Sequence, residues 1–286
     1  MKKRLLPLIL SFLTCTNLPL LSKVIVFDLG GVCFETSKTG MAREVNALGL
    51  LFNKMAGGDP QARMFEFLNE TFGHQVPTNP DEAQDFWLYA TGHGMTLPEI
   101  WCENMRGTCS SQELLERSEP HFETFFESSR ELKLIKGLMQ AIFDPEIIAK
   151  HMYPIKKGAK LVADVAQKEG NTCMVLSNFA ADAFDALYAK KESQKIFKHI
   201  AQENLIVSGH IGLMKPHADI YEYLKAKLIA MDERFADPVF LKQECIFIDD
   251  QIENIIAARK CGITALWLSD GDYKKLRHEL TVLDVL

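Results

Sequence analysis

Short apolar runs alternate with helical patterns along the second half of the chain. Residues 23–28 read KVIVFD and residues 172–178 read TCMVLSN, and both runs end in polar residues, as buried strands of a parallel sheet do. Residues 156–170 have the spacing of an amphipathic helix that ends near Gly170. Strand, helix and strand in succession predict a right-handed parallel α/β sheet.

The same alternation continues toward the C-terminal end of the sequence. Expected helices cover residues 181–190, 217–231 and 252–260, and expected strands cover residues 200–202, 245–248 and 263–268.

Residues 41–151 follow a different pattern. Apolar side chains recur there at helical spacing, as in Met64, Phe65, Phe67 and Leu68, and glycine- and proline-rich stretches separate the helical segments. No convincing strand pattern occurs in this region. The sequence therefore predicts an α/β core made of residues 23–37 and 152–286, with a helical insert at residues 38–151.

Residues 1–22 form an apolar N-terminal segment in which three basic residues precede an apolar stretch from Leu5 to Leu21. Pro7 and Pro19 interrupt it, and it falls short of the roughly 20 clean apolar residues that cross a bilayer, so we expect no stable transmembrane span. Its layout is that of a secretory signal peptide, although Leu20 is unfavourable for cleavage after Ser22. We expect an exported protein, periplasmic or secreted; the alternative is a cytoplasmic protein that keeps the extension.

The composition is that of an ordinary globular protein and excludes intrinsic disorder. Of 286 residues, 47% are hydrophobic and 24% charged. The net charge is −6, from 32 basic and 38 acidic residues, and no basic stripe follows the first four residues. We therefore expect no nucleic-acid partner. No feature indicates an oligomeric state.

The seven cysteines are odd in number and contain no CxxC pair. A disulfide framework or a zinc site is not expected, and several thiols lie in apolar runs, where cysteine acts as a small hydrophobic residue. One bridge between Cys102 and Cys109 stays open at this point.

Polar residues with chemical potential follow the predicted strands. They are Asp28, Ser177, Asn178, Asp249, Asp250 and, in the segment GLMKPHADIY, Lys215. In doubly wound sheets, ligands bind beyond the carboxyl ends of the strands, so these side chains should meet at one edge. A carboxylate, a hydroxyl, a lysine and an acidic pair suit phosphoryl transfer, in which a divalent metal and a cation neutralise phosphate oxygens while a carboxylate attacks phosphorus.

These residues, in this order, resemble the haloacid dehalogenase-like (HAD) superfamily. The resemblance covers residues 23–35 and about 153–268, through VIVFDLGGVCF, VLSN, SGHIGLMKPHADIYEYL and IFIDDQIENIIAARKCGI. Ser177 follows Asp28 by 149 positions, whereas Lys215 follows Ser177 by only 38. This spacing is similar to subfamily I, so the resemblance implies a Rossmann-like doubly wound parallel sheet with an inserted all-helical cap.

The resemblance also implies a magnesium site. Asp28 would attack phosphorus, form an aspartyl-phosphate and bind Mg²⁺, and Gly30 would offer its backbone carbonyl to the ion. Asp250 would be a side-chain ligand, with Asp249 as a further ligand or an acceptor behind it. Asn254 would orient water or Asp250.

On the phosphate side, the resemblance implies that Ser177 donates its hydroxyl to a phosphate oxygen and that Asn178 belongs to the same binding loop. Lys215 would hold both the phosphate and the charge of Asp28. The implied function is Mg²⁺-dependent hydrolysis of a small phosphorylated metabolite, with sugar phosphates as one candidate class.

One position departs from the superfamily pattern. Many of its phosphatases carry a second aspartate, the general acid–base, where this chain has Gly30, and losing such a group typically costs 10²–10⁴-fold in rate. Glu35, His74, His93, Glu103 or a good leaving group could replace it. The departure leaves open a weakly active or inactive binding protein.

The same first motif is compatible with a 2-haloacid dehalogenase, in which the aspartate displaces halide from carbon. That reaction needs no metal. Two adjacent acids, Asp249 and Asp250, repel each other unless a cation lies between them, which favours magnesium over dehalogenation.

Overall fold

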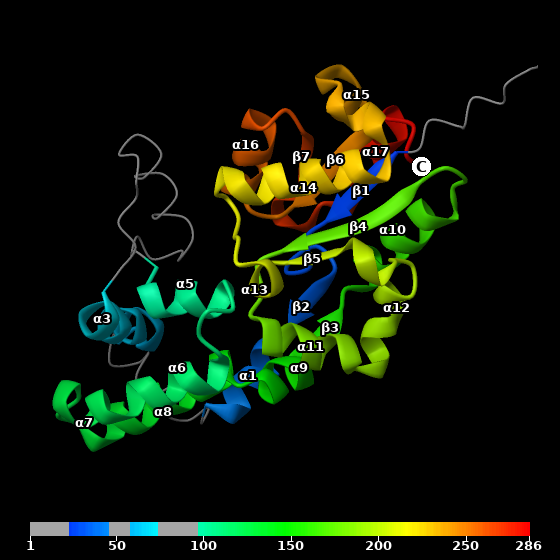
Figure 1. The fold of residues 1–286 in the computed structure, drawn as a ribbon. Helices are drawn as coiled ribbons and strands as arrows, with labels where there is room; N and C mark the ends of the chain where they lie inside the picture. Colours follow the sequence, from blue (N-terminus) through cyan, green and yellow to red (C-terminus); the bar gives the residue numbers. More distant parts are fainter. Residues whose placement is uncertain (1–22, 46–57, 74–96) are drawn as a thin grey trace, which may run out of the picture.

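A five-stranded parallel sheet forms the centre of the protein (Figure 1). The computed structural model describes residues 23–45, 58–73 and 97–286. The strand order is β5-β4-β1-β6-β7, and every pairing within this sheet is parallel. The predicted α/β class is therefore confirmed, while the predicted signal segment at residues 1–22 lies outside the described residues.

The strands of this sheet are β1 (Val24–Phe27), β4 (Thr172–Ser177), β5 (Leu205–Val207), β6 (Cys245–Asp249) and β7 (Thr264–Trp267). The helices around it are α10 (Lys156–Gln167), α11 (Ala181–Ala189), α12 (Gln194–Phe197), α13 (Ser208–Ile211), α14 (Ala218–Met231), α15 (Pro238–Glu244), α16 (Ile252–Lys260) and α17 (Tyr273–Val282). Of the helices in the described ranges, none is both long enough and apolar enough to cross a membrane.

Alternate side chains of each strand enter two different cores. Ile25 and Phe27 of β1 belong to a cluster with α10, α11, α12 and α17. Val24 and Val26 belong to a second cluster with α14, α15 and α16. All four side chains are at most 2% exposed, because helices cover both faces of the sheet. Figure 1 shows α14 and α10 on opposite sides of β4.

One predicted strand is wrong. We expected a strand at residues 200–202, but β5 runs from Leu205 to Val207, and Gln202–Asn204 form a 3₁₀ turn before it. Leu205, Ile206 and Val207 are the continuous apolar run that pairs with β4, whereas the expected segment contains only one large apolar residue.

The inserted residues build a separate core. The helices are α1 (Lys38–Glu44), α3 (Pro60–Phe72), α5 (Glu99–Met105), α6 (Ser111–Ser118), α7 (Phe122–Phe125), α8 (Ser129–Phe143) and α9 (Pro145–His151). At its centre the Phe67 ring stacks on Phe122 at 4.8 Å and meets Phe125 edge-on at 5.2 Å. We call residues 38–151 the cap; its helices α3 and α5–α8 lie to one side of the sheet (Figure 1).

A short antiparallel ribbon joins the cap to the core. It pairs β2 (Phe34–Thr36) with β3 (Met152–Pro154), so the chain enters and leaves the cap side by side. Three-residue strands carry too little periodicity to be recognised in a sequence.

The thiols have the structural role expected of them. All six cysteines within the described residues are free, including Cys102 and Cys109, so the bridge left open above is not formed. Cys33, Cys173 and Cys245 are buried in the two cores of the sheet.

Two helical glycines should respond oppositely to alanine. A Cβ at Gly158 of α10 would lie 2.3 Å from the main-chain oxygen of Val32, whereas a Cβ at Gly137 of α8 would meet nothing closer than 3.6 Å. We expect Gly158→Ala to lower the free energy of unfolding by roughly 1–3 kcal/mol through overpacking. Gly137→Ala should raise it by about 0.5–1 kcal/mol. Urea titration measures both, and equal effects would contradict this packing.

Candidate active site

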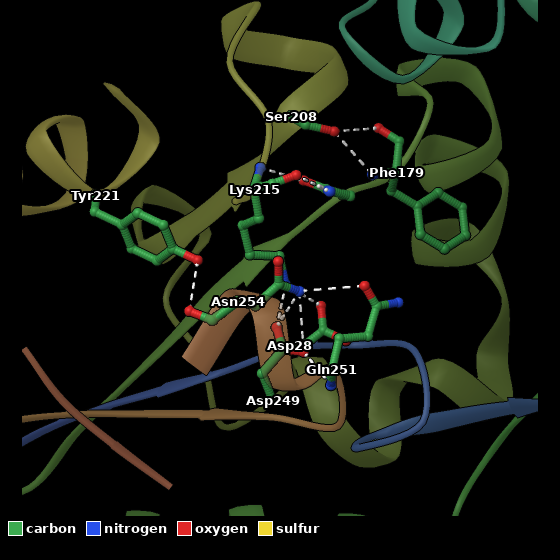
Figure 2. A network of polar contacts seen from close by, with 9 residues as sticks. Asp28, Phe179, Ser208, Lys215, Tyr221, Asp249, Gln251 and Asn254 are labelled. Atoms are coloured by element: carbon green, nitrogen blue, oxygen red, sulfur yellow. Dashed lines mark hydrogen bonds and ion pairs between the residues drawn. The ribbon is translucent and has the colours of Figure 1, made fainter. Parts of the chain in front are cut away.

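A lysine is buried between two carboxylates at the C-terminal edge of the sheet (Figure 2). The Nζ atom of Lys215 donates to Asp28 Oδ1 at 2.7 Å and to Asp249 Oδ2 at 2.6 Å. Asp28 follows β1 and Asp249 ends β6, and these two strands are neighbours. The three residues are at most 6% exposed. Residues expected at strand ends thus meet at one point.

The Asp249 carboxylate is fully occupied by donors. Its Oδ1 accepts the Gln251 amide at 2.8 Å, and the Asn254 side-chain amide donates to Oδ1 and Oδ2 at 3.1 and 3.0 Å. The Tyr221 hydroxyl in turn donates to the Asn254 main-chain oxygen at 2.9 Å. Asn254 therefore orients Asp249, whereas we had expected it to orient water or Asp250.

Asn178 holds the main chain of Lys215. Its Nδ2 donates to the Lys215 carbonyl at 2.8 Å, and its Oδ1 accepts the Lys215 amide at 2.8 Å. An amide engaged in this way positions the lysine, a role that the sequence did not indicate. Ser177, next to it, is 1% exposed and lowers the pKa of Asp28 through a hydrogen bond.

Three carboxylates converge beside the lysine. Asp28, Asp249 and Asp250 each offer an oxygen, and these atoms lie within 4.8 Å of one another. Oxygen donors are the ligands that Mg²⁺ prefers. Gly31, at φ 69°, leaves the space that Asp250 uses, because a Cβ there would lie 2.0 Å from Asp250 Oδ2. The residues present therefore fit a divalent cation.

Burial and crowding shift the protonation of this cluster. Burial raises the pKa of Asp28 to about 6, and repulsion from Asp249 adds to this while Lys215 opposes it. Loss of solvation, followed by the charges of Asp28 and Asp249, raises the pKa of Asp250 to about 7. Burial alone would lower the pKa of Lys215, but Asp249 and Asp28 raise it. Three acids facing one lysine leave an excess of negative charge.

Gly30, which the resemblance places at the general acid–base position, borders open space. A Cβ added there would meet only Asp28 Oδ2, at 3.8 Å. Among the candidate replacements, Glu35 is exposed on β2, and Glu103 accepts a hydrogen bond from Arg117 at 2.8 Å within the cap. His74 and His93 lie outside the described residues.

The structure also adds a residue that sequence reasoning missed. The Trp267 indole donates to the main-chain oxygen of Asp250 at 2.9 Å. Trp267 ends β7, so the rule that placed the other residues at strand ends could have found it. Tyr221 had no such signal, because it lies within helix α14 and not at a strand end.

A family model described as haloacid dehalogenase-like hydrolase matches residues 22–262. The chain belongs to this family of hydrolases, which agrees with the resemblance noted in its motifs. Among curated proteins, a drimenol cyclase from Aspergillus calidoustus is 24% identical over 106 residues, which are 37% of this chain and 17% of the cyclase. The chain therefore spans a small part of the curated relative that it matches.

Several solved structures are similar to this chain at low identity. A HAD family enzyme of Bacteroides thetaiotaomicron in a magnesium complex is 15% identical, with a TM-score of 0.50 over 90% of this chain and 98% of that chain. A predicted HAD-like hydrolase of Porphyromonas gingivalis is 16% identical, with a TM-score of 0.48 over 91% and 98%. L-2-haloacid dehalogenase of Xanthobacter autotrophicus is 16% identical, with a TM-score of 0.43 over 91% and 83%. At 15% identity, the likeness to the first of these structures shows the fold alone.

The raised pKa values predict how added Mg²⁺ would change the stability of the protein at different pH. Without metal, folded Asp28 and Asp250 keep protons that the unfolded chain has released, so their contribution to stability is complete below about pH 4 and is lost as the pH rises through 6 to 7. A cation that binds the ionised carboxylates offsets this loss. We expect Mg²⁺ to raise the Tm more at about pH 8 than at about pH 5. Scanning calorimetry with and without the ion measures this, and equal shifts would contradict it.

Proposed function

We propose that this hydrolase is a magnesium-dependent phosphatase that removes phosphate from a small phosphorylated metabolite through a phosphorylated Asp28. The observation that carries the proposal is the buried Lys215 between Asp28 and Asp249, with Asp250 beside them. A carboxylate nucleophile, a fixed ammonium and a set of oxygen ligands are the groups that phosphoryl transfer requires.

Each residue then has a defined task. Lys215 favours the ionised form of Asp28 against its burial and faces the charge of the phosphoryl group, while Ser177 at the end of β4 supplies a hydroxyl. The Asp28 carboxylate attacks phosphorus, and the bond between phosphorus and the leaving oxygen breaks as that oxygen takes a proton from solvent water. A second water then attacks the phosphorus of the aspartyl-phosphate and gives a proton to solvent. The bond between phosphorus and the Asp28 oxygen breaks, which releases orthophosphate and restores the carboxylate. A divalent cation held by Asp28 and Asp250 would neutralise phosphate oxygens.

Asp249 takes a supporting part in this proposal. Both of its oxygens already accept donors, and it is 0% exposed. Asp249 therefore holds Lys215 in place, and its negative charge lies next to the cation site without a free oxygen for the ion.

Phosphate chemistry suits this charge distribution better than halide displacement does. Displacing halide from carbon needs a carboxylate but no metal, so a third carboxylate near Asp28 would only add repulsion. The cluster of Asp28, Asp249 and Asp250 against a single lysine favours a reaction that uses a cation. The magnesium complex of the Bacteroides thetaiotaomicron enzyme makes Mg²⁺ the first cation to test.

The decisive test removes the nucleophile. The full chain is assayed for phosphate release from sugar phosphates, nucleotides and p-nitrophenyl phosphate, with Mg²⁺ or EDTA. We expect Asp28→Asn to lose activity by about 10³-fold or more. Asp185→Asn, at an aspartate whose side chain is 68% exposed, is the matched control and should keep full activity. Release that persists in EDTA or in Asp28→Asn would refute the mechanism.

Gly30 offers a gain-of-function test of the missing general acid–base. Because a Cβ at this position meets only Asp28 Oδ2 at 3.8 Å, an aspartate side chain can be introduced without displacing the main chain. We expect Gly30→Asp to raise kcat for a poor leaving group by roughly 10-fold or more, and Gly30→Asn, of the same size, to leave it unchanged. If both variants have the same rate, another group already supplies the proton.

A further inference from the structure

The cap contacts the core at a second place, away from the β2–β3 ribbon. At the start of α6, the Ser111 amide and hydroxyl both donate to the Asp182 carboxylate of α11, each at 2.8 Å. Gly107 lies so close to the core that a Cβ there would be 2.0 Å from the main-chain oxygen of Gly209. Residues 105–111 of the cap are thus docked on residues 179–182 and 208–209 of the core.

Ser208 lies at the centre of this docking contact. Its hydroxyl donates to the Met105 carbonyl of the cap at 2.6 Å and accepts the Phe179 amide of the core at 2.9 Å. The neighbouring Gly209 amide donates to the Phe179 carbonyl at 3.0 Å. Ser208 is 0% exposed, so water does not replace these bonds. Figure 2 shows Ser208 directed toward Phe179, on the side of the network away from Asp28.

The contacts continue from Phe179 to the buried lysine. Phe179 directly follows Asn178, whose side-chain amide makes both 2.8 Å bonds to the Lys215 main chain. Lys215 then reaches Asp28 and Asp249 through Nζ. A continuous series of hydrogen bonds and covalent links therefore joins a cap carbonyl to the carboxylates of the site.

We propose that Ser208 is a positioning residue that makes the placement of Lys215 depend on the docking of cap residues 105–111. This inference rests on the proposed function, because it assigns a means of control to the same site. When the cap is seated, Ser208 holds Phe179, and Asn178 then holds the lysine main chain. When the cap lifts, the Ser208 hydroxyl loses Met105, and the loop that carries Ser177 and Asn178 loses a fixed support. The protein would thus align its phosphate-binding groups only beneath a closed cap.

The two ion pairs of Lys215 explain why the position of its main chain matters. Lys215 must satisfy two carboxylates through one ammonium group, so a small shift of its main chain lengthens at least one of the bonds at 2.6 and 2.7 Å. Misplacement of a catalytic group by about 1 Å can reduce a rate by about 10²-fold. A cap that sets the position of Lys215 through Ser208 therefore controls turnover, although Ser208 itself does not touch the substrate.

The test weakens the docking contact from each side. Ser208→Ala removes the hydroxyl that joins Met105 to Phe179, and Ser111→Ala removes one of the two bonds to Asp182. The matched control is Ser118→Ala, in the same helix as Ser111. Among the described residues, the buried Ser118 hydroxyl bonds to Leu114 alone, within the cap. Each full-length variant is assayed with p-nitrophenyl phosphate and Mg²⁺ and examined by amide hydrogen exchange.

We expect Ser208→Ala and Ser111→Ala to lower kcat by about 3- to 10-fold with little change in KM, since Ser208→Ala loses the bonds to Met105 and Phe179 and Ser111→Ala loses a bond to Asp182. In Ser111→Ala, the amides of Phe179 and Lys215 should exchange faster by a similar factor, although neither touches Ser111. The double variant should lose less than the product of the two single losses. Ser118→Ala should match the wild type in all of these measurements.

Several outcomes would overturn the inference. It fails if Ser111→Ala leaves the Lys215 amide unchanged, if the two single losses multiply, or if Ser118→Ala has the same effect as Ser111→Ala. The exchange measurement needs no turnover. A wild-type protein that releases no phosphate, but in which Ser111→Ala still loosens Lys215, would refute the proposed function and support the coupling.

Discussion

The burial of the Lys215 ammonium between Asp28 and Asp249 is the constraint on which the rest of the site depends. A charge removed from water costs several kcal/mol unless its partners are close and their remaining hydrogen-bonding atoms are satisfied. Here both ion pairs of Lys215 are shorter than 3 Å, and neighbouring polar side chains make hydrogen bonds to the paired residues. Asn178 holds the lysine main chain, and Asn254 holds Asp249. The geometry is therefore specified by a network rather than by single contacts.

The same constraint determines what the site can bind. Burial, and then repulsion among the acids, raises the pKa values of Asp28 and Asp250, because one lysine compensates only part of the charge of the three carboxylates. A divalent cation would remove the imbalance and allow all three acids to be ionised. An anionic substrate can then approach a carboxylate nucleophile that would otherwise repel it. The excess of carboxylates would destabilise an ordinary core, but here it would bind a divalent cation.

The placement of the site at the end of the sheet follows from the architecture. Parallel strands bring all their C-terminal ends to one edge. The cap, which follows β2, contacts Ser208 at that edge, and the β2–β3 ribbon joins its entry and exit. The additional contact through Ser208 and Asp182 connects the cap to the loops that carry the site. The parallel sheet therefore places the charged residues of the site and the contact with the cap at the same edge.

The amino-acid sequence by itself determined the central strands and most of the site. Short apolar runs such as VIVF and CIFID predict strands covered on both faces. Asp28 follows the first run and Asp249 ends the second, so the places of both acids were predictable from local pattern. The three-residue strands were missed or misplaced, because three residues carry too little periodicity and their partners are distant in sequence. Tertiary structure alone decided that Asn178 turns to the Lys215 main chain, that Asn254 serves Asp249, and that Ser208 joins cap to core. A short polar side chain bonds to whatever donor or acceptor folding brings within about 3 Å, and its type states only that it needs a partner.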